Sequence, residues 1–141
     1  MVCIYCGHET EVYNSRERKR NPSVWRRRRC IACVAQFTTD EHPDYRISLV
    51  VSGQHHKLYP FNRDKLFLSL YKSLGHRSDA LESATSLTDT VIGLLLRKCA
   101  SRDGVITMQE LTRFAYQALK RYDVLAANTY KAYHQAYLEK R

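Results

Sequence analysis

Two pairs of cysteines constrain the fold of this chain more than any other feature of its sequence. Cys3 and Cys6 form one CxxC pair, and Cys30 and Cys33 form the second. Two residues between thiolates allow both members of a pair to turn toward one ion, and two such pairs complete a tetrahedral zinc site. Because sulfur fills all four positions, we expect this zinc to be structural rather than catalytic.

The cysteines belong to a short segment that differs from the rest of the chain. Residues 1–42 are too few to bury a large apolar core, so a bound metal has to supply much of their folding free energy. Short β-prone pieces around Val12, Val24 and Phe37 predict a small antiparallel zinc ribbon. A polar stretch that contains Pro43 follows. We therefore predict two domains, at residues 1–42 and 45–141.

The net charge of the chain indicates which kinds of partner it can bind. The chain has 23 Lys and Arg residues against 14 Asp and Glu residues, a formal net charge of +9. Such a charge suits nucleic acid or an anionic membrane surface. No stretch is apolar for long enough to span a membrane, and Cys3 leaves no room for a signal peptide before it. We expect a soluble, intracellular protein, where paired cysteines bind metal instead of forming disulfides.

Many cations of the first domain lie between the two cysteine pairs. Arg16 opens one cluster, and Arg26, Arg27, Arg28 and Arg29 form an uninterrupted run. Arginine binds phosphate oxygens and can pair with guanine through two hydrogen bonds, so these five residues are the candidate DNA contacts. On a strand, Arg26 and Arg28 would share one face and Arg27 and Arg29 the other. Alternatively, these arginines form a solvated face that offsets the negative charge of the thiolates and does not contact DNA.

The second domain reads as a β-hairpin followed by helices, so the predicted fold class is α+β. Two extended segments, 46–51 and 57–61, flank a turn that contains Gly53. Four helical patterns follow, and capping residues mark their predicted first turns: Asn62, Asp79, Thr107 with Glu110, and Asp123. The predicted architecture is a small β-rich ribbon, then a hairpin and a four-helix bundle.

Apolar residues at helical spacing predict which faces of these helices are buried. On the second helix the predicted stripe includes Leu81, Leu87 and Val91. On the last helix it includes Tyr130 and Tyr133, which we interpret as core or as a dimer interface.

The first domain resembles the zinc ribbon of the NrdR transcriptional repressors, which regulate bacterial ribonucleotide reductase genes. Besides the cysteine pairs, the resemblance rests on Ser15-Arg16, Arg26 to Arg28 and Phe37-Thr38-Thr39. Trp25 takes the place of the family's first arginine, and Arg29 takes its variable position. The resemblance implies a zinc-dependent repressor that binds paired operator sites on double-stranded DNA. It also implies a bacterial cytoplasmic protein, associated with the nucleoid when DNA is bound.

The second domain resembles the ATP-cone of the same family, a hairpin over a helical bundle that binds ATP or dATP. Pro60-Phe61, Lys65-Leu66 and the segment 123–126 match its landmarks. The resemblance implies adenine nucleotides as allosteric ligands, a homo-oligomer whose size depends on the nucleotide, and no catalytic step. The residues assigned to the nucleotide are Val51, His55, Lys57, Phe61 and Lys65.

This ATP-cone-like domain departs from the family pattern in two places. Gly53-Gln54 stands about where the family usually has a Lys-Arg pair that holds nucleotide phosphates, and His55 and Lys57 lie nearby to compensate. Around Ala127, Thr129 and His134 the family's arginine and tyrosine are replaced.

The sequence leaves two alternatives to a DNA-binding repressor. In the first, the sensor domain is the same but the ribbon grips a protein partner. In the second, the chain is an enzyme. Neither clustered carboxylates nor a Ser-His-Asp arrangement is apparent in the sequence, so no catalytic residue is predicted.

Overall fold

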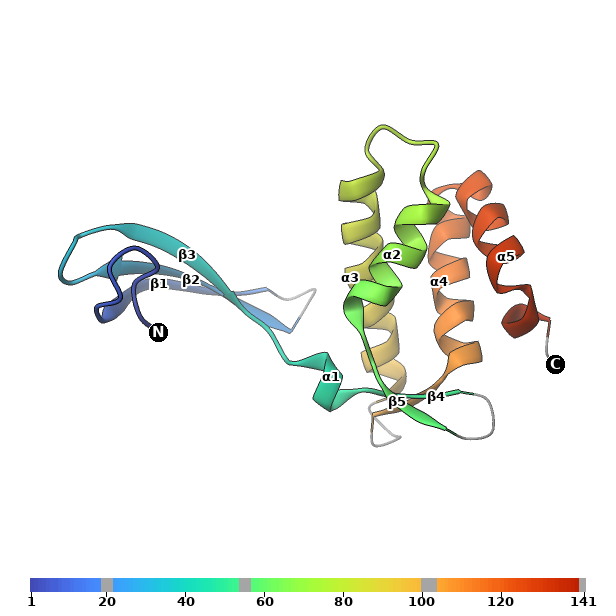
Figure 1. Ribbon diagram of the computed structural model, residues 1–141, viewed down its shortest axis with the longest axis horizontal. Helices are drawn as coiled ribbons and strands as arrows, with labels where there is room; N and C mark the ends of the chain where they lie inside the picture. Colours follow the sequence, from blue (N-terminus) through green and yellow to red (C-terminus); the bar gives the residue numbers. More distant parts are fainter. Residues whose placement is uncertain (19–21, 54–56, 100–103, 140–141) are drawn as a thin grey trace. The chain divides into compact units, whose positions relative to one another are not determined.

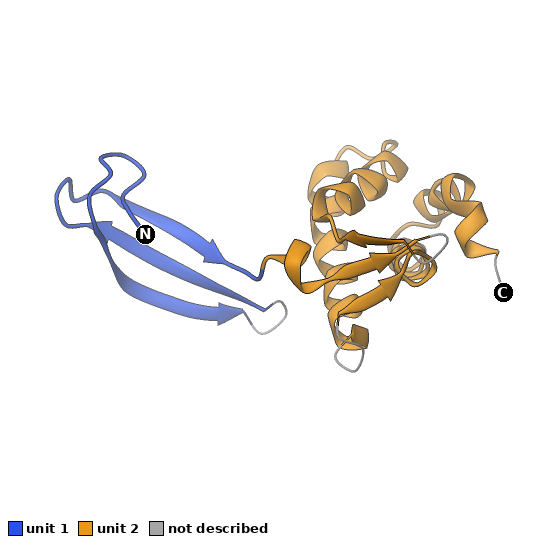
Figure 2. Cartoon of the chain, turned by 60° about the horizontal axis from the view of Figure 1, so that its bottom comes forward, with its two compact units in different colours: residues 1–43 blue, residues 44–141 orange. Residues whose placement is uncertain are grey.

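The chain forms two compact units, Met1–Pro43 and Asp44–Arg141 (Figure 2). The computed structural model describes residues 1–18, 22–53, 57–99 and 104–139. The units divide inside the polar stretch that we placed between residues 42 and 45. The predicted α+β class is confirmed. In the described part of the chain, no helix combines the length and the apolar character needed to cross a bilayer.

The first unit is a three-stranded antiparallel sheet with both cysteine loops at one end. Its strands are β1 (Thr10–Arg18), β2 (Ser23–Cys30) and β3 (Gln36–Glu41), with β2 in the middle (Figure 1). All three β-prone pieces of the sequence lie in these strands. The pairing of β1 with β2 shifts between Val12 and Asn14, so that Tyr13 is the extra residue of a bulge.

The second unit places a small sheet at one end of four long helices (Figure 1). Its helices are α1 (Tyr45–Ser48), α2 (Arg63–Ser73), α3 (Ala80–Cys99), α4 (Met108–Tyr122) and α5 (Val124–Leu138). Its strands are β4 (Val50–Ser52), β5 (Leu58–Pro60) and β6 (Val105–Thr107). β4 lies in the middle, antiparallel to β5 and parallel to β6. The predicted hairpin is therefore present, with a third strand that the sequence did not predict.

Residues 46–51 are not the continuous extended segment that the sequence predicts. Tyr45–Ser48 forms one helical turn, and Asp44 caps it by accepting a hydrogen bond from the Arg46 backbone N–H at 3.0 Å. The Asp44 carboxylate also binds the Arg46 guanidinium at 2.8 Å. Local capping by an aspartate outweighs the β-preference of the neighbouring residues. The strand therefore begins only at Val50.

Capping residues begin three of the long helices where the sequence predicts them. The fourth predicted cap, Asp79, stands just before α3, and its carboxylate binds the Arg77 guanidinium and the Ser83 hydroxyl. Asn62 accepts from the Lys65 backbone N–H at 2.9 Å, and Asp123 caps α5. Thr107 and Glu110 form both halves of a capping box. The cap at Asn62 marks where the hairpin ends and the helices begin, and the caps at Thr107 and Asp123 mark the starts of α4 and α5.

The core of the second unit combines all four long helices with the sheet. Its largest fully buried side chains are Phe61, Leu49, Leu70, Leu74, Leu95, Ile106 and Leu119. Each buried Leu or Phe contributes roughly 1.5–3 kcal/mol to folding.

Two side chains of the predicted stripes are exposed instead. Leu81 is 57% exposed, because the buried stripe of α3 starts at Ala80 and continues through Ala84. Tyr133 is 74% exposed, whereas Tyr130 is 2% exposed. The backbone of α5 leaves the helical conformation at His134 (φ −120°, ψ 20°), and its buried face ends there.

Candidate functional site

The four paired cysteines come together at one end of the ribbon. Their Sγ atoms all lie within 4.8 Å of one another. The Sγ atoms of Cys3 and Cys33 are 3.7 Å apart, and those of Cys6 and Cys30 are 3.4 Å apart. Four sulfurs bound at about 2.3 Å to a tetrahedral zinc ion would be separated by roughly 3.8 Å. The cluster therefore has the size and the ligand type that zinc requires.

Backbone N–H groups in the cysteine loops point at the sulfur atoms. Tyr5 donates to Cys3 Sγ at 3.5 Å, and Cys33 donates to Cys30 Sγ at 3.4 Å. The hydrogen bond from Cys33 lowers the pKa of the Cys30 thiol to about 6. Val34 closes the second loop with a φ of 61°, which is rare for a β-branched residue. The backbone hydrogen bonds thus favour the thiolate at Cys30. At Cys6, a backbone hydrogen bond from His8 is outweighed by the sulfur atoms of Cys30 and Cys33, which raise the thiol pKa to about 12.

Strand β2 divides its four arginines between two faces, as the alternation predicts. Arg26 and Arg28 are half-buried. Arg26 Nε donates to the Glu41 carboxylate at 2.8 Å, and Arg28 Nε donates to Thr39 Oγ1 at 3.2 Å. Both side chains are therefore already held within the ribbon.

Arg27 and Arg29 are exposed on the opposite face of the sheet. Within the described residues, neither of them forms an ion pair. Arg16 pairs directly with Trp25 across the β1–β2 ladder, and paired residues share a face. Arg16, Trp25, Arg27 and Arg29 therefore lie together, and we call this set the arginine face.

The bulge at Tyr13 is what brings Arg16 to the arginine face. Val12 pairs with Arg28 on the other face, so strict alternation along β1 would also put Arg16 there. The extra residue shifts the alternation by one position. Arg16 was predicted from the sequence as a DNA contact. The face of the sheet on which it lies could not be predicted, because no sequence pattern marks the bulge.

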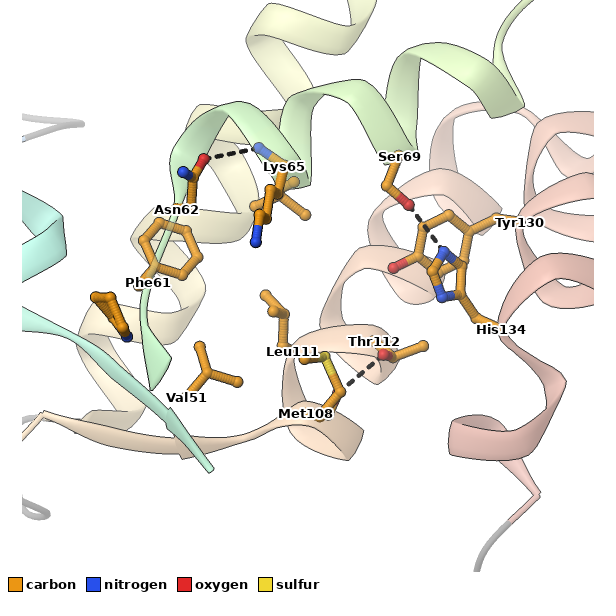
Figure 3. A pocket seen from close by; sticks show the side chains of 12 residues that line it. Val51, Phe61, Asn62, Lys65, Ser69, Met108, Leu111, Thr112, Tyr130 and His134 are labelled. Atoms are coloured by element: carbon orange, nitrogen blue, oxygen red, sulfur yellow. Dashed lines mark hydrogen bonds between the residues drawn. The ribbon is translucent and has the colours of Figure 1, made fainter. Parts of the chain in front are cut away.

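The second unit contains a cavity of about 200 Å³ beneath the hairpin (Figure 3). Residues of β4, β5, α2, α4 and α5 line it. Among the residues predicted to bind a nucleotide, Val51, Phe61 and Lys65 line this cavity. Lys57 does not line it, and its ammonium group lies 5.5 Å from the centre of the Tyr59 ring. His55 lies outside the described residues.

One end of the cavity is polar and carries two rings. The Ser69 hydroxyl lies 2.8 Å from His134 Nε2, and the ring centres of His134 and Tyr130 are 4.3 Å apart. Burial lowers the pKa of His134, which keeps its ring neutral at pH 7, and raises the pKa of Tyr130 to about 12. This end of the cavity therefore offers uncharged hydrogen-bonding groups beside flat ring surfaces.

The residues at this polar end were not predicted from the sequence to contact a ligand. Ser69 lies on α2, whereas Tyr130 and His134 lie on α5. No spacing rule links residues so far apart in the chain. The only signal at His134 was its departure from the family pattern.

Comparison with known proteins gives matches that cover both units. The family model described as "Transcriptional repressor NrdR-like, N-terminal domain" matches residues 1–41. A protein of Maricaulis maris is 29% identical over 140 residues, which cover 96% of this chain and 84% of that protein. One of Brucella anthropi is 33% identical over 144 residues, covering 96% and 87%. One of Gluconobacter oxydans is 34% identical over 127 residues, covering 89% and 74%. All three carry the name transcriptional repressor NrdR.

Proposed function

Since the chain belongs to the NrdR family of transcriptional repressors, we propose that it represses transcription by binding DNA through a zinc-braced ribbon, under the control of an adenine nucleotide. The proposed targets are ribonucleotide reductase genes of a bacterium, in whose cytoplasm the protein acts. The observation that carries the DNA-binding part is the arginine face, on which three exposed arginines lie around Trp25 on a three-stranded sheet.

Zinc is proposed to bind to Cys3, Cys6, Cys30 and Cys33, whose sulfur atoms fit a tetrahedral ion. The ion supplies no chemistry to a substrate, because four sulfurs leave no open coordination position. Its role is to hold the two cysteine loops together and so fix one end of the three-stranded sheet. The arginine face is then presented on a fixed backbone, which limits the entropy lost on binding.

The five candidate arginines take two different roles in this proposal. Arg16, Arg27 and Arg29 contact phosphates or base edges directly, because they are exposed on the arginine face. Arg26 and Arg28 act through the ribbon itself, because Glu41 and Thr39 already bind them. All five arginines therefore keep a role in the proposed function.

The cavity beneath the hairpin is the proposed site for ATP or dATP. Val51, Phe61 and Leu66 give it apolar walls that suit a flat base, and Lys65 supplies a cation at its edge. Nucleotides that stabilise different oligomers would change which pairs of ribbons reach paired DNA sites. The nucleotide and the DNA would then be coupled through the assembly of the protein.

The direct test is DNA binding by the double variant Arg27→Ala, Arg29→Ala in the full-length, zinc-loaded protein. The probe is a labelled duplex from the promoter of a ribonucleotide reductase gene, titrated at several salt concentrations. Each phosphate contact contributes about 0.9 to the slope of log affinity against log salt. We expect affinity to fall at least tenfold and the slope to fall by about 2.

The matched control is the double variant Arg26→Ala, Arg28→Ala. It removes the same number of charges from the opposite face of the same strand. We expect it to retain the wild-type salt slope, even where a weakened ribbon lowers affinity. Unchanged affinity in the Arg27, Arg29 variant, or a slope lost only in the control, would rule out the arginine face as the DNA contact.

One observation favours the alternative in which the ribbon grips a protein. Apolar side chains are exposed at the cysteine loops, with Ile4 at 62%, Tyr5 at 68% and Ile31 at 63%. Exposed apolar groups close together are typical of protein interaction sites. Substituting Ile4 and Ile31 with serine leaves DNA affinity unchanged if these residues serve only a protein partner, and lowers capture of that partner.

A further inference from the structure

A wider groove of about 620 Å³ runs between α2 and α5, next to the cavity beneath the hairpin. Lys65, Leu68, Ser69, Lys72, Tyr133 and His134 line it. Lys65, Ser69 and His134 also line the cavity, so the two spaces meet at these three side chains. In Figure 3, the Lys65 side chain extends from α2 toward the cavity.

We propose that the groove is the phosphate subsite of the ligand held in the cavity, and that Lys72 is a binding residue for the polyphosphate chain. This inference rests on the proposed binding of an adenine nucleotide. The base occupies the apolar cavity, the ribose passes Ser69 and His134, and the phosphates lie along α2 between Lys65 and Lys72.

The spacing along α2 supports a path for an extended anion. Lys65, Leu68, Ser69 and Lys72 follow one another at intervals of three, one and three residues, so they form one stripe on the helix. Seven residues correspond to about 10 Å along the axis. Two flexible ammonium groups at the ends of this stripe can contact different phosphates of one chain.

The charges in the groove also favour an anion. None of the six lining residues is acidic, and two of them are lysines. Among the residues that the structure describes, neither lysine side chain forms an ion pair. Both side chains are exposed, so binding a phosphate requires no rearrangement of the core.

In this proposal, the cations that bind the phosphates come from α2 and not from the hairpin. At the described part of the hairpin turn stands Gly53, and the Lys57 ammonium lies against the Tyr59 ring. The α2 stripe instead presents Lys65 and Lys72 at the mouth of the cavity and beyond it.

The test compares ATP with adenosine by calorimetric titration of the full-length, zinc-loaded protein. Lys72→Gln should weaken ATP binding about tenfold, the loss of one charge-assisted hydrogen bond, and leave adenosine binding unchanged. Lys72→Arg should restore most of the ATP affinity. Inorganic tripolyphosphate should compete with ATP in the wild type and less well in Lys72→Gln.

The control is the variant Lys131→Gln. Lys131 is an exposed residue of α5 that lines a different groove, between α4 and α5. The substitution removes the same charge from the same unit, so it should leave ATP affinity unchanged. Equal ATP affinities in the Lys72 and Lys131 variants overturn the subsite while leaving the nucleotide proposal intact. Equal losses of ATP and adenosine in Lys72→Gln also overturn it, since they indicate a structural role. A wild type that binds neither compound overturns both.

Discussion

At the scale of single residues, Gly104, just before β6, packs closely against Ser48 at the end of α1. Its φ is 76°, and a Cβ atom placed there would meet the carbonyl oxygen of Ser48 well inside contact distance. Its own carbonyl accepts a hydrogen bond from the Val50 N–H at 2.9 Å. Only a residue without a side chain allows this approach.

Gly104→Ala should therefore lower the free energy of unfolding of the second unit by about 1–3 kcal/mol. Gly93→Ala is the matched control. Gly93 lies inside α3, and the nearest atom to its added Cβ is Arg97 Nη1 at 3.7 Å. We expect it to gain about 0.5–1 kcal/mol from helix propensity. Urea unfolding followed by helical circular dichroism measures both changes, and similar effects of the two variants would contradict this account.

At the scale of elements, Asp123 connects two helices and the loop that precedes α3. Its N–H caps the end of α4 by donating to the Leu119 carbonyl at 2.7 Å, and its carboxylate caps α5 through the Ala126 N–H at 3.0 Å. The same carboxylate binds His76 Nε2 at 3.0 Å and Arg77 Nη1 at 3.2 Å. One side chain thus fixes the angle of the α4–α5 turn and docks the loop onto it.

These contacts make the second unit sensitive to acid. The Ala126 N–H, followed by His76 and Arg77, lowers the pKa of Asp123 to about 2. A carboxyl group whose pKa is lowered by folding stabilises the fold above its unfolded pKa of about 4. That stabilisation is lost as the pH falls from about 4 to about 2. Asp123→Asn keeps a capping side chain but removes this titration.

We therefore expect the wild type to lose thermal stability more steeply than Asp123→Asn between about pH 5 and about pH 2, the window set by the unfolded and folded pKa values. Melting followed at 222 nm reports on the second unit, because the described helices all lie there. The exposed residue Asp64 provides the control Asp64→Asn. Parallel pH profiles for the wild type and Asp123→Asn would show that the junction does not titrate as described.

Features that depend on neighbouring residues in the sequence were predicted. Features that depend on contacts between residues far apart in the chain were not. The caps at Asn62, Thr107 and Asp123 depend on side chains next to the helix they begin, so residue type and spacing revealed them. The strand β6 has only three residues and depends on pairing with β4. The cavity likewise depends on α5 lying against α2, which no local pattern encodes.

At the scale of the whole molecule, the two units depend on different sources of stability. The first has few buried side chains, among them Cys3 and Cys30, whereas the second has a continuous apolar core. The chain has one tryptophan, and Trp25 lies in the first unit. Indole fluorescence and helical circular dichroism therefore report on different units of the same molecule.

Removing zinc with a strong chelator should unfold the first unit and leave the second folded. We expect Trp25 emission to shift to longer wavelength while the signal at 222 nm stays nearly constant. Cys6→Ser should behave like the chelated protein, and Cys99→Ala, which changes a cysteine outside the cluster, should keep the wild-type zinc content. Loss of both signals together would show that the units do not fold independently.

The pairing of β4 with β6 also sets an order of events during synthesis. β4 can form a hairpin with β5 as soon as both have emerged, because the two strands are close in sequence. Its other edge must wait until α2 and α3 have been made, since Val50 pairs with Val105. Contacts between distant residues are costly to close and slow folding. The nascent chain therefore holds a half-paired central strand while residues 61–104 are made. β6 then completes the sheet, and the two helices that follow it complete the cavity.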